Sequence, residues 1–540
     1  MSVIGSSVPA QTFNQQILET LSQIRVMGHE VVADTLDHRF SLVSLTPEEK
    51  ESFHVSELTV NMVTPSHDIV PVSIHFTSLP IVHIQADTTS KDFAEGRITL
   101  HDPILPTARH ICTLQRWRGA SSMSRTKKSF ALKLQRDNGV KLDTTLLGLR
   151  SDNSWILDAM AIDRSRMRNR ISLDLWNEFS TPSYVTQYDL DAHNGTDGCF
   201  VEVFYNNHYE GIYCLSEKLD RKQLKLMKHK GGKMHGAIYK TDKWAPLKTP
   251  ETPYDNTSST WGSYTIDYPS LDDGEPIDWE PLDRIITYLN KSSTNVLRAS
   301  LPDKIDLPVW LDYFLFIELL MADDNMSKNQ YFYFYDTDAD DPMGIAPWDL
   351  DHSWGRNYKG DLLAATRSFS IVNQAHTCLR RYYGDTFFLG TRYCELRQTY
   401  FQPDALKARF ARVFELFRTS GAGQREELRW GDIDGIHLDF GYEQSYIEDW
   451  ITQRIAVLDD KYDYLFVGID TPPAHSKTSS LSLNTTPGCL HLLSDSDQSV
   501  TVHSLQGFPV ATLHLQANEP ARLPLSRGIY IIEGKKVMIR

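Results

Sequence analysis

The sequence predicts an α+β protein, in which a mixed body of strands and then helices precedes a small all-β unit. Three observations predict this class. Short segments that alternate apolar and polar residues dominate from residue 79 to about 215, helical periodicity dominates after residue 278, and alternating segments return after residue 486. A run of strands followed by a run of helices is typical of the α+β class.

Length and composition divide the chain. Its 540 residues exceed what one hydrophobic core supports, so we expect several domains. We predict a lead-in over 1–75, a body over 76–466, a Pro/Ser/Thr linker over 467–485 and a β-sandwich domain over 486–540. The 41% apolar content excludes disorder over the whole length.

The charge limits the partners. The 55 Lys and Arg against 70 Asp and Glu give a net charge of −15, which argues against a general nucleic-acid binder. A nucleotide ligand stays compatible with this charge, because it needs only a few local cations. Partners therefore include no nucleic acid.

The elements follow in order. A helical pattern covers residues 13–27, and alternation predicts strands over 56–62, 79–84 and 130–134. Residues 155–179 predict helices, and residues 201–205 and 209–215 flank a predicted hairpin turn at Asn206 and Asn207.

After Asp278 the pattern is mainly helical, with two strands predicted over 331–335 and 343–348. The longest apolar stretch, 313–322, contains Glu318 and predicts a core helix, since no segment supplies the ~20 apolar residues of a membrane span. Helices resume over 404–466. Strands are then predicted over 500–505, 509–515, 528–532 and 535–539.

Cysteines and the N-terminus leave alternatives open. The six cysteines form no C-x-x-C pair, which argues against zinc and a disulfide-dense framework but leaves one or two disulfides open. Val8-Pro9-Ala10 resembles the end of a signal peptide whose earlier part is missing. Either the N-terminus of this sequence is miscalled or trimmed, or these first residues form a disordered N-terminal tail.

An acidic segment resembles a calcium-binding loop but lacks two residues that such a loop requires. Residues 336–340 place Asp at alternate positions, but such a loop needs Gly sixth and Glu twelfth, where this chain has Asp341 and Pro347. An acidic hairpin tip is the better interpretation.

Three short segments carry residues suited to phosphate chemistry. The first, residues 116–122, places Gly119, Ser121 and Ser122 beside Arg118 and is followed by Lys127 and Lys128. Backbone N–H groups, hydroxyls and cations together suit a phosphate. An ordinary polar turn is the alternative.

The second and third segments carry acids. Asp324 precedes Asn329 by five residues, the spacing with which kinase catalytic loops place a base and a metal ligand. Asp349 and Asp351 follow the next predicted strand, and residues two apart on a strand point to one side, so both could reach a divalent ion. An Asx turn that closes the strand is the alternative.

The order of these segments resembles the CotH kinase family, the spore-coat-protein-H type of atypical protein kinase. The resemblance covers roughly residues 76–466. It rests on residues 79–84, 98–100, 118–119, 127–129, 151–155, Asp163, Arg168, Asn169, 211–213, 217–218, Asp324, Asn329 and 348–351. It implies a two-lobed, kinase-like body that transfers the γ-phosphate of ATP to Ser or Thr hydroxyls of a surface or coat protein.

The resemblance also implies a role for each site residue. Asp324 would orient or deprotonate the acceptor hydroxyl, and Lys127 or Lys128 would neutralise phosphate charge. Mg²⁺ or Mn²⁺ would be held by Asn329, Asp349 and Asp351. Contacts to ATP are expected from Arg118, Gly119, Ser121, Ser122 and Glu217. The rival hypothesis is a kinase-fold adhesin or scaffold without catalysis.

The C-terminal strands resemble a second pattern, the sorting domain of type IX secretion substrates. The matching residues are 504–510, 525–530 and 535–540. This resemblance implies that the type IX machinery is a partner and that the protein reaches the surface of a Bacteroidetes-type bacterium. An accessory β-sandwich in a cytoplasmic protein is the alternative.

Overall fold

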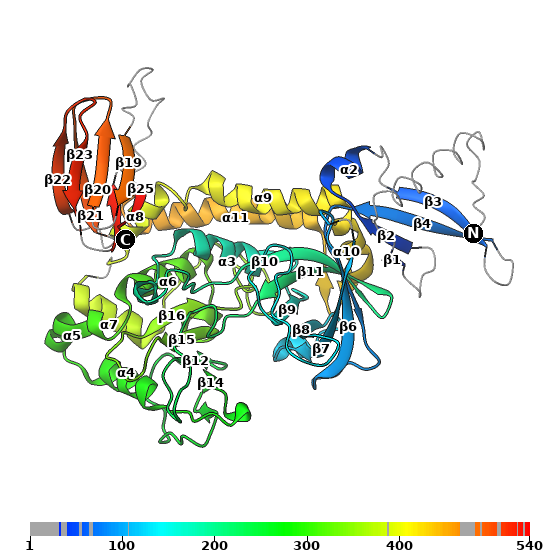
Figure 1. Cartoon of the computed structure of the whole chain (residues 1–540), viewed down its shortest axis with the longest axis horizontal. Coiled ribbons are helices and arrows are strands. Elements are labelled where there is room, and N and C mark those ends of the chain that lie inside the picture. Colours follow the sequence, from blue (N-terminus) through cyan, green and yellow to red (C-terminus); the bar gives the residue numbers. More distant parts are fainter. Residues whose placement is uncertain are drawn as a thin grey trace.

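The structure is a mixed α+β fold built from several sheets and a large set of helices (Figure 1). This computed structural model describes residues 32–33, 40–52, 57–63, 69–105, 107–385, 388–464, 481–486, 489–504, 509–525, 528–532 and 535–539. The helix predicted over 13–27 and residues 467–480 of the predicted linker lie outside these residues, whereas the last part of that linker, 481–485, belongs to a strand instead.

The first sheet belongs to the lead-in. Its four strands are ordered β1-β2-β4-β3, and the alternating segment predicted over 56–62 is one of them. The elements are β1 (Val32–Ala33), β2 (Phe40–Ser44), α2 (Pro47–Ser52), β3 (Glu57–Val63) and β4 (Ile69–Thr77).

A closed barrel of seven strands follows. Its order is β10-β11-β9-β8-β7-β6-β5, and β5 closes it by pairing in parallel with β10. Alternate residues of each strand, such as Leu132 and Leu134, point into a common core. The strands are β5 (Ile81–Gln85), β6 (Ala94–His101), β7 (Arg109–Arg118), β8 (Ser129–Gln135), β9 (Ser154–Asp158), β10 (Gly198–Tyr205) and β11 (His208–Glu217).

The barrel confirms the predicted hairpin and corrects one predicted helix. Strands β10 and β11 pair through a turn at Asn206 and Asn207, both with positive φ. Residues 155–158, expected to be helical, instead form strand β9, and the helix begins only at Arg168. A short apolar segment does not reveal its period, and pairing with β8 and β11 decided it.

A second sheet, ordered β13-β14-β12-β15-β16, lies at the centre of the helical part. The two strands predicted near 331 and 343 form its hairpin β15–β16, with the acidic run at the tip. Its strands are β12 (Ala237–Thr241), β13 (Thr260–Trp261), β14 (Tyr264–Tyr268), β15 (Gln330–Phe334) and β16 (Gly344–Pro347).

Helices cover this sheet and share one large core. The predicted core helix is α6, whose residues from Tyr313 to Leu320 are all buried. The helices are α3 (Arg168–Phe179), α4 (Glu280–Lys291), α5 (Thr294–Ser300), α6 (Leu307–Leu320), α7 (Gln374–Tyr383), α8 (Gly390–Arg397), α9 (Pro403–Ser420), α10 (Ala422–Trp430) and α11 (Phe440–Lys461). Within the described residues, no helix is both long and apolar enough to cross a membrane.

Helices α9 and α11 pack side by side along the length of the body, and the short α10 docks on barrel strand β11 (Figure 1). Short 3₁₀ turns connect the larger elements: η1 (Ser121–Ser124), η2 (Tyr184–Gln187), η3 (Leu271–Asp273), η4 (Leu301–Asp303) and η5 (Asp324–Met326). The two-residue strands β17 (Asp432–Ile433) and β18 (Ile436–His437) form a small ribbon between α10 and α11.

The last described residues form a three-stranded sheet, β19-β20-β23, and a four-stranded sheet, β22-β21-β24-β25, around one apolar core. Their strands are β19 (Leu481–Thr486), β20 (Cys489–Ser494), β21 (Gln498–Ser504), β22 (Pro509–Leu515), β23 (Ala521–Pro524), β24 (Gly528–Ile532) and β25 (Lys535–Ile539). The four strands predicted after residue 500 are all present. All six cysteines lie in the described part of the chain, and each is a free thiol.

Candidate active site

A cleft of about 1080 Å³ lies where one end of the barrel meets the second sheet. Strand β7 and the η1 turn form one wall, and the ends of β9 and β12 with the first turn of α3 form another. The segments around Asp324 and Asp349 complete it. Residues far apart in the sequence therefore share one concave space, the usual form of a ligand site.

Seven of the predicted site residues line this cleft: Arg118, Gly119, Ser122, Asp324, Asn329, Asp349 and Asp351. Lys127, Lys128 and Glu217 are not among the residues that line it. The side chain of Ser121 lies outside what the structure describes.

Asp324 begins the short η5 turn that follows helix α6. Its Oδ2 accepts a hydrogen bond from Lys328 Nζ at 3.0 Å and lies 3.6 Å from His352 Nδ1. The interaction with His352, with help from Lys328, outweighs burial and lowers the pKa of Asp324 to about 2. Asp324 is therefore an anion at any physiological pH.

Asp349 and Asp351 do reach one cleft, but not in the way that the spacing suggested. Strand β16 ends at Pro347, so both acids belong to the loop after it, and Asp349 takes a left-handed φ of 56°. Between them, Leu350 is buried and anchors the loop. Desolvation raises the pKa of both carboxyls, although Asp349 stays accessible from the cleft.

Asn329 precedes β15 with a left-handed φ of 54°. Its backbone N–H donates to Thr241 O at 3.1 Å, and its Nδ2 lies 3.5 Å from Asp349 O. The hairpin thus brings the amide of Asn329 next to the Asp349 loop, as a shared metal site requires.

His352 joins the two acidic segments and was not assigned a role from the sequence. Its Nε2 lies 3.4 Å from Asp351 Oδ1, opposite the Nδ1 that faces Asp324. Burial alone would lower the pKa of His352, but the carboxylates of Asp351 and Asp324 raise it to about 9. The ring of His352 therefore lies between the side chains of Asp324 and Asp351 and carries a positive charge at neutral pH.

The turn after β7 has the geometry of an anion cradle. Gly119 has a φ of 119°, and a Cβ there would lie 1.9 Å from Ser122 Oγ, so the turn requires glycine. Arg118 stacks over the ring of Trp348 at 5.9 Å. Among the described residues, no hydrogen bond or ion pair engages its guanidinium, which leaves five donors facing the cleft.

The two lysines after this turn point to different surroundings. Lys128 Nζ donates to the carbonyl oxygens of Met123 and Arg125, at 2.6 Å and 2.5 Å, and so braces the turn from behind. It shapes the cradle without lining the cleft.

Lys127 and Glu217 do not support the phosphate contacts expected of them. Lys127 is 2% exposed, and its Nζ donates to Glu426 Oε1 at 2.7 Å and to the Ile212 carbonyl. Glu217 is buried at the end of β11, where it accepts hydrogen bonds from the backbone N–H groups of Arg150 and Asp197. Burial and these hydrogen bonds therefore tie both side chains to the interior of the barrel region.

Several cleft residues escaped the sequence prediction. Asp158 ends β9, and its carboxylate accepts from Ser129 Oγ at 3.2 Å. Lys240 and Lys243 add positive charge from the end of β12. The proximity of His352 to Asp351 in the sequence was an available signal. For Asp158 the sequence held no such signal, because Asp158 lies 166 residues before Asp324.

The donor set fits a divalent cation. Asp351 Oδ1 is buried and, among the described residues, has no hydrogen-bond partner. Two carboxylates and an amide line the same cleft, and hard cations such as Mg²⁺ prefer oxygen ligands of this kind. Asp349, Asp351 and Asn329 would hold such an ion.

Comparison with known proteins gives one finding. The model of a family described as CotH kinase protein matches residues 116–458, which is more than half of the chain. This match spans β7 to α11 and contains every residue that lines the cleft except Lys91 and Asp92. A search among curated proteins found no match.

Proposed function

Since this chain belongs to the CotH kinase protein family, which implies ATP use, we propose that it is a protein kinase that transfers the ATP γ-phosphate to Ser or Thr hydroxyls of a partner protein. One observation carries the proposal. An ionised Asp324, the oxygen ligands of Asp349 and Asp351, and the unengaged guanidinium of Arg118 all face a single cleft.

The cleft offers complementary surfaces for the nucleotide. The Gly119 turn and Arg118 supply N–H donors and charge for the phosphates. Trp117, Ile156 and Met160 line a more apolar part of the wall, which suits a purine ring. The triphosphate would then run from this wall toward Asp349.

The reaction needs positioning more than strong base catalysis. The acceptor oxygen bonds to the γ-phosphorus, the bond from that phosphorus to the β–γ bridging oxygen breaks, and ADP leaves. The hydroxyl proton passes to Asp324. With a pKa of about 2, Asp324 is a weak base that orients the hydroxyl and takes the proton late, as a loose transition state allows.

Neighbouring cations hold this arrangement. Lys328 fixes one oxygen of Asp324, and the cationic His352 keeps Asp324 and Asp351 apart in fixed positions. When bound, a divalent ion supplies neutralisation of the phosphate charge.

The test is direct phosphorylation. Purified protein is incubated with labelled ATP, Mg²⁺ or Mn²⁺ and a Ser-rich acceptor, beside Asp324→Asn and Asp349→Asn. We expect each substitution to reduce labelling at least a hundredfold, since one removes the anion that orients the acceptor hydroxyl and the other removes an oxygen ligand of the divalent ion.

Lys225→Met provides the matched control, because Lys225 lies outside the cleft residues. Equal labelling by wild type and both Asp variants, or none by any protein, would refute the kinase proposal and leave the non-catalytic scaffold.

We also propose that the protein acts at the surface of a Bacteroidetes-type bacterium, with the strands after residue 480 as its sorting signal. The support is the sequence resemblance and the compact β fold of these strands. Removal of residues 481–540 should retain the protein inside a host that has type IX secretion, as measured by cell fractionation. Unchanged export would contradict this proposal.

A further inference from the structure

The loop that carries Asp349 and Asp351 is held in an unfavourable backbone conformation. Asp349 and Trp354 take left-handed φ values of 56° and 48°, a region that is unfavourable for residues other than glycine. Such a loop keeps its shape only if its surroundings impose it. The question is which residues do so.

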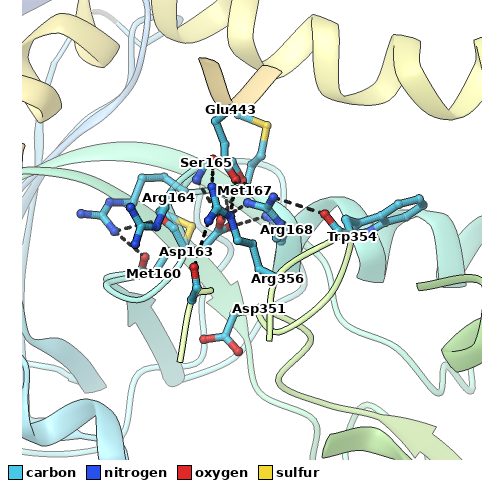
Figure 2. Close-up of polar contacts among 12 residues, drawn as sticks. Met160, Asp163, Arg164, Ser165, Met167, Arg168, Asp351, Trp354, Arg356 and Glu443 are labelled. Atoms are coloured by element: carbon cyan, nitrogen blue, oxygen red, sulfur yellow. Dashed lines mark hydrogen bonds and ion pairs between the residues drawn. The ribbon is translucent and has the colours of Figure 1, made fainter. Parts of the chain in front are cut away.

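The first turn of α3 contacts this loop at both ends. Arg168, fully buried, donates from Nε to Ser353 O at 3.0 Å and from Nη2 to Trp354 O at 3.3 Å. The next residue, Asn169, accepts from the Leu350 backbone N–H at 3.0 Å through Oδ1. Figure 2 shows Arg168 reaching Trp354, with Asp351 below it on the same loop.

Two carboxylates fix the Arg168 guanidinium in turn. Nη1 donates to Asp163 Oδ1 at 2.7 Å, and Nη2 donates to Glu443 Oε1 at 2.6 Å (Figure 2). Asp163 also accepts from the backbone N–H groups of Met167 and Arg168, so it caps α3 as well. Glu443 is on α11, and Arg356 from the far side of the loop donates to it too.

Four hydrogen bonds thus engage Nε, Nη1 and Nη2 of Arg168, and Arg168 is not among the residues that line the cleft. A planar guanidinium held on two sides by carboxylates presents its remaining N–H groups in fixed directions. Arg168 can therefore fix the positions of two successive backbone carbonyls, those of Ser353 and Trp354. A lysine at this position, with a single flexible amine, does not fix both.

We propose that Arg168 is a positioning residue: together with Asn169, it holds the loop that carries Asp349 and Asp351 in the conformation that binds a divalent cation. The inference rests on the proposed function, which assigns those carboxylates to the metal. It adds that the metal affinity depends on α3 and, through Glu443, on α11.

The test is Mn²⁺ binding, measured by the loss of the free-ion EPR signal, in wild type, Arg168→Lys and Arg170→Lys. Arg170 is the matched control. It is buried on the same helix and pairs with Asp174 and Thr196 O, but within the described part of the chain it makes no hydrogen bond or ion pair with the loop. Every protein is measured well below its own melting temperature.

We expect Arg168→Lys to raise the Mn²⁺ Kd ten- to a hundredfold, as loss of an outer partner of metal ligands does, and Arg170→Lys to change it less than about threefold. A merely structural role would lower Tm in both variants and leave Kd unchanged in both. Equal Kd values for the two variants would overturn the inference.

If Arg168→Lys does not fold, Asn169→Ala is the deciding variant. It removes the hydrogen bond from Leu350 together with a long one, 3.4 Å, from Asn169 Nδ2 to Asp158 Oδ2, and an unchanged Kd there overturns the proposal. Absence of Mn²⁺ binding by wild type is a different result. It refutes the metal assignment of the proposed function, and the inference falls with it.

Discussion

The buried charges behind the barrel give the sharpest quantitative prediction. Glu426 of α10 is fully buried and accepts three hydrogen bonds, from Lys127 Nζ, Arg166 Nε and the Ile212 backbone N–H, each at 2.7 Å. Two buried cations therefore share one carboxylate. The two possible deletions in this cluster should differ strongly in cost.

Glu426→Gln leaves both Lys127 and Arg166 without a counter-ion inside the protein. Breaking a buried pair in this way costs about 3–5 kcal/mol. Lys127→Met leaves the Arg166–Glu426 pair neutral and replaces a cation whose burial, despite Glu426, lowers its pKa to about 8. The penalty of a lost partner for Ile212 O offsets that relief, so we expect a loss of no more than about 1–2 kcal/mol.

Urea unfolding followed by tryptophan fluorescence measures this difference. All eleven tryptophans lie between Trp117 and Trp450, so the signal reports the body and not the terminal units. ATP affinity is measured on the same proteins. A loss in Lys127→Met equal to that in Glu426→Gln would refute the reasoning. If Lys127→Met instead bound ATP tenfold more weakly while keeping its stability, the phosphate contact that the sequence predicted for Lys127 would be supported.

Three further outcomes follow from the structure. Gly119→Ala should lower ATP affinity tenfold or more with Tm nearly unchanged, because the Cβ would meet Ser122 Oγ and reshape an exposed turn; calorimetric titration checks this, and unchanged affinity contradicts it. Burial lowers the pKa of His376 to about 4, so the unfolded chain binds more protons and stability falls by up to about 3 kcal/mol as pH drops from 6.5 to 4. His376→Phe, which keeps the packing between Phe314 and Phe388, should weaken this acid dependence in urea titrations at several pH values; an identical pH dependence speaks against it. Asp351→Asn should raise metal-free stability by about 1 kcal/mol, because burial raises the pKa of that carboxyl, while Mn²⁺ binding is lost; a lower Tm would contradict it.

Local sequence was sufficient wherever the relevant residues are neighbours in the chain. Asp324, Asn329 and Asp349 lie on one β-hairpin and its flanks, so their spacing alone predicted that they would meet. The Gly119 turn was predictable because its conformation depends on the absence of a Cβ. The helix α6 followed from an apolar stretch too short for a membrane and too long for a strand.

Other features depended on partners that are distant in the sequence. Residues 155–158 became a strand because β8 and β11 flank them, which no local period records. Lys127 and Lys128 are adjacent and chemically alike, but only the position of Glu426, about 300 residues later, draws one of them into the core.

The sequence by itself therefore determined the residue types of the candidate site: its acids, its glycine turn and their order along the chain. Tertiary structure decided which side chains share the cleft, adding Asp158 and His352 and withdrawing Lys127 and Glu217. The physical reason is that local pattern sets backbone conformation within a few residues. Burial and charge pairing act across the whole fold, and they alone assign a side chain to the core or to the site.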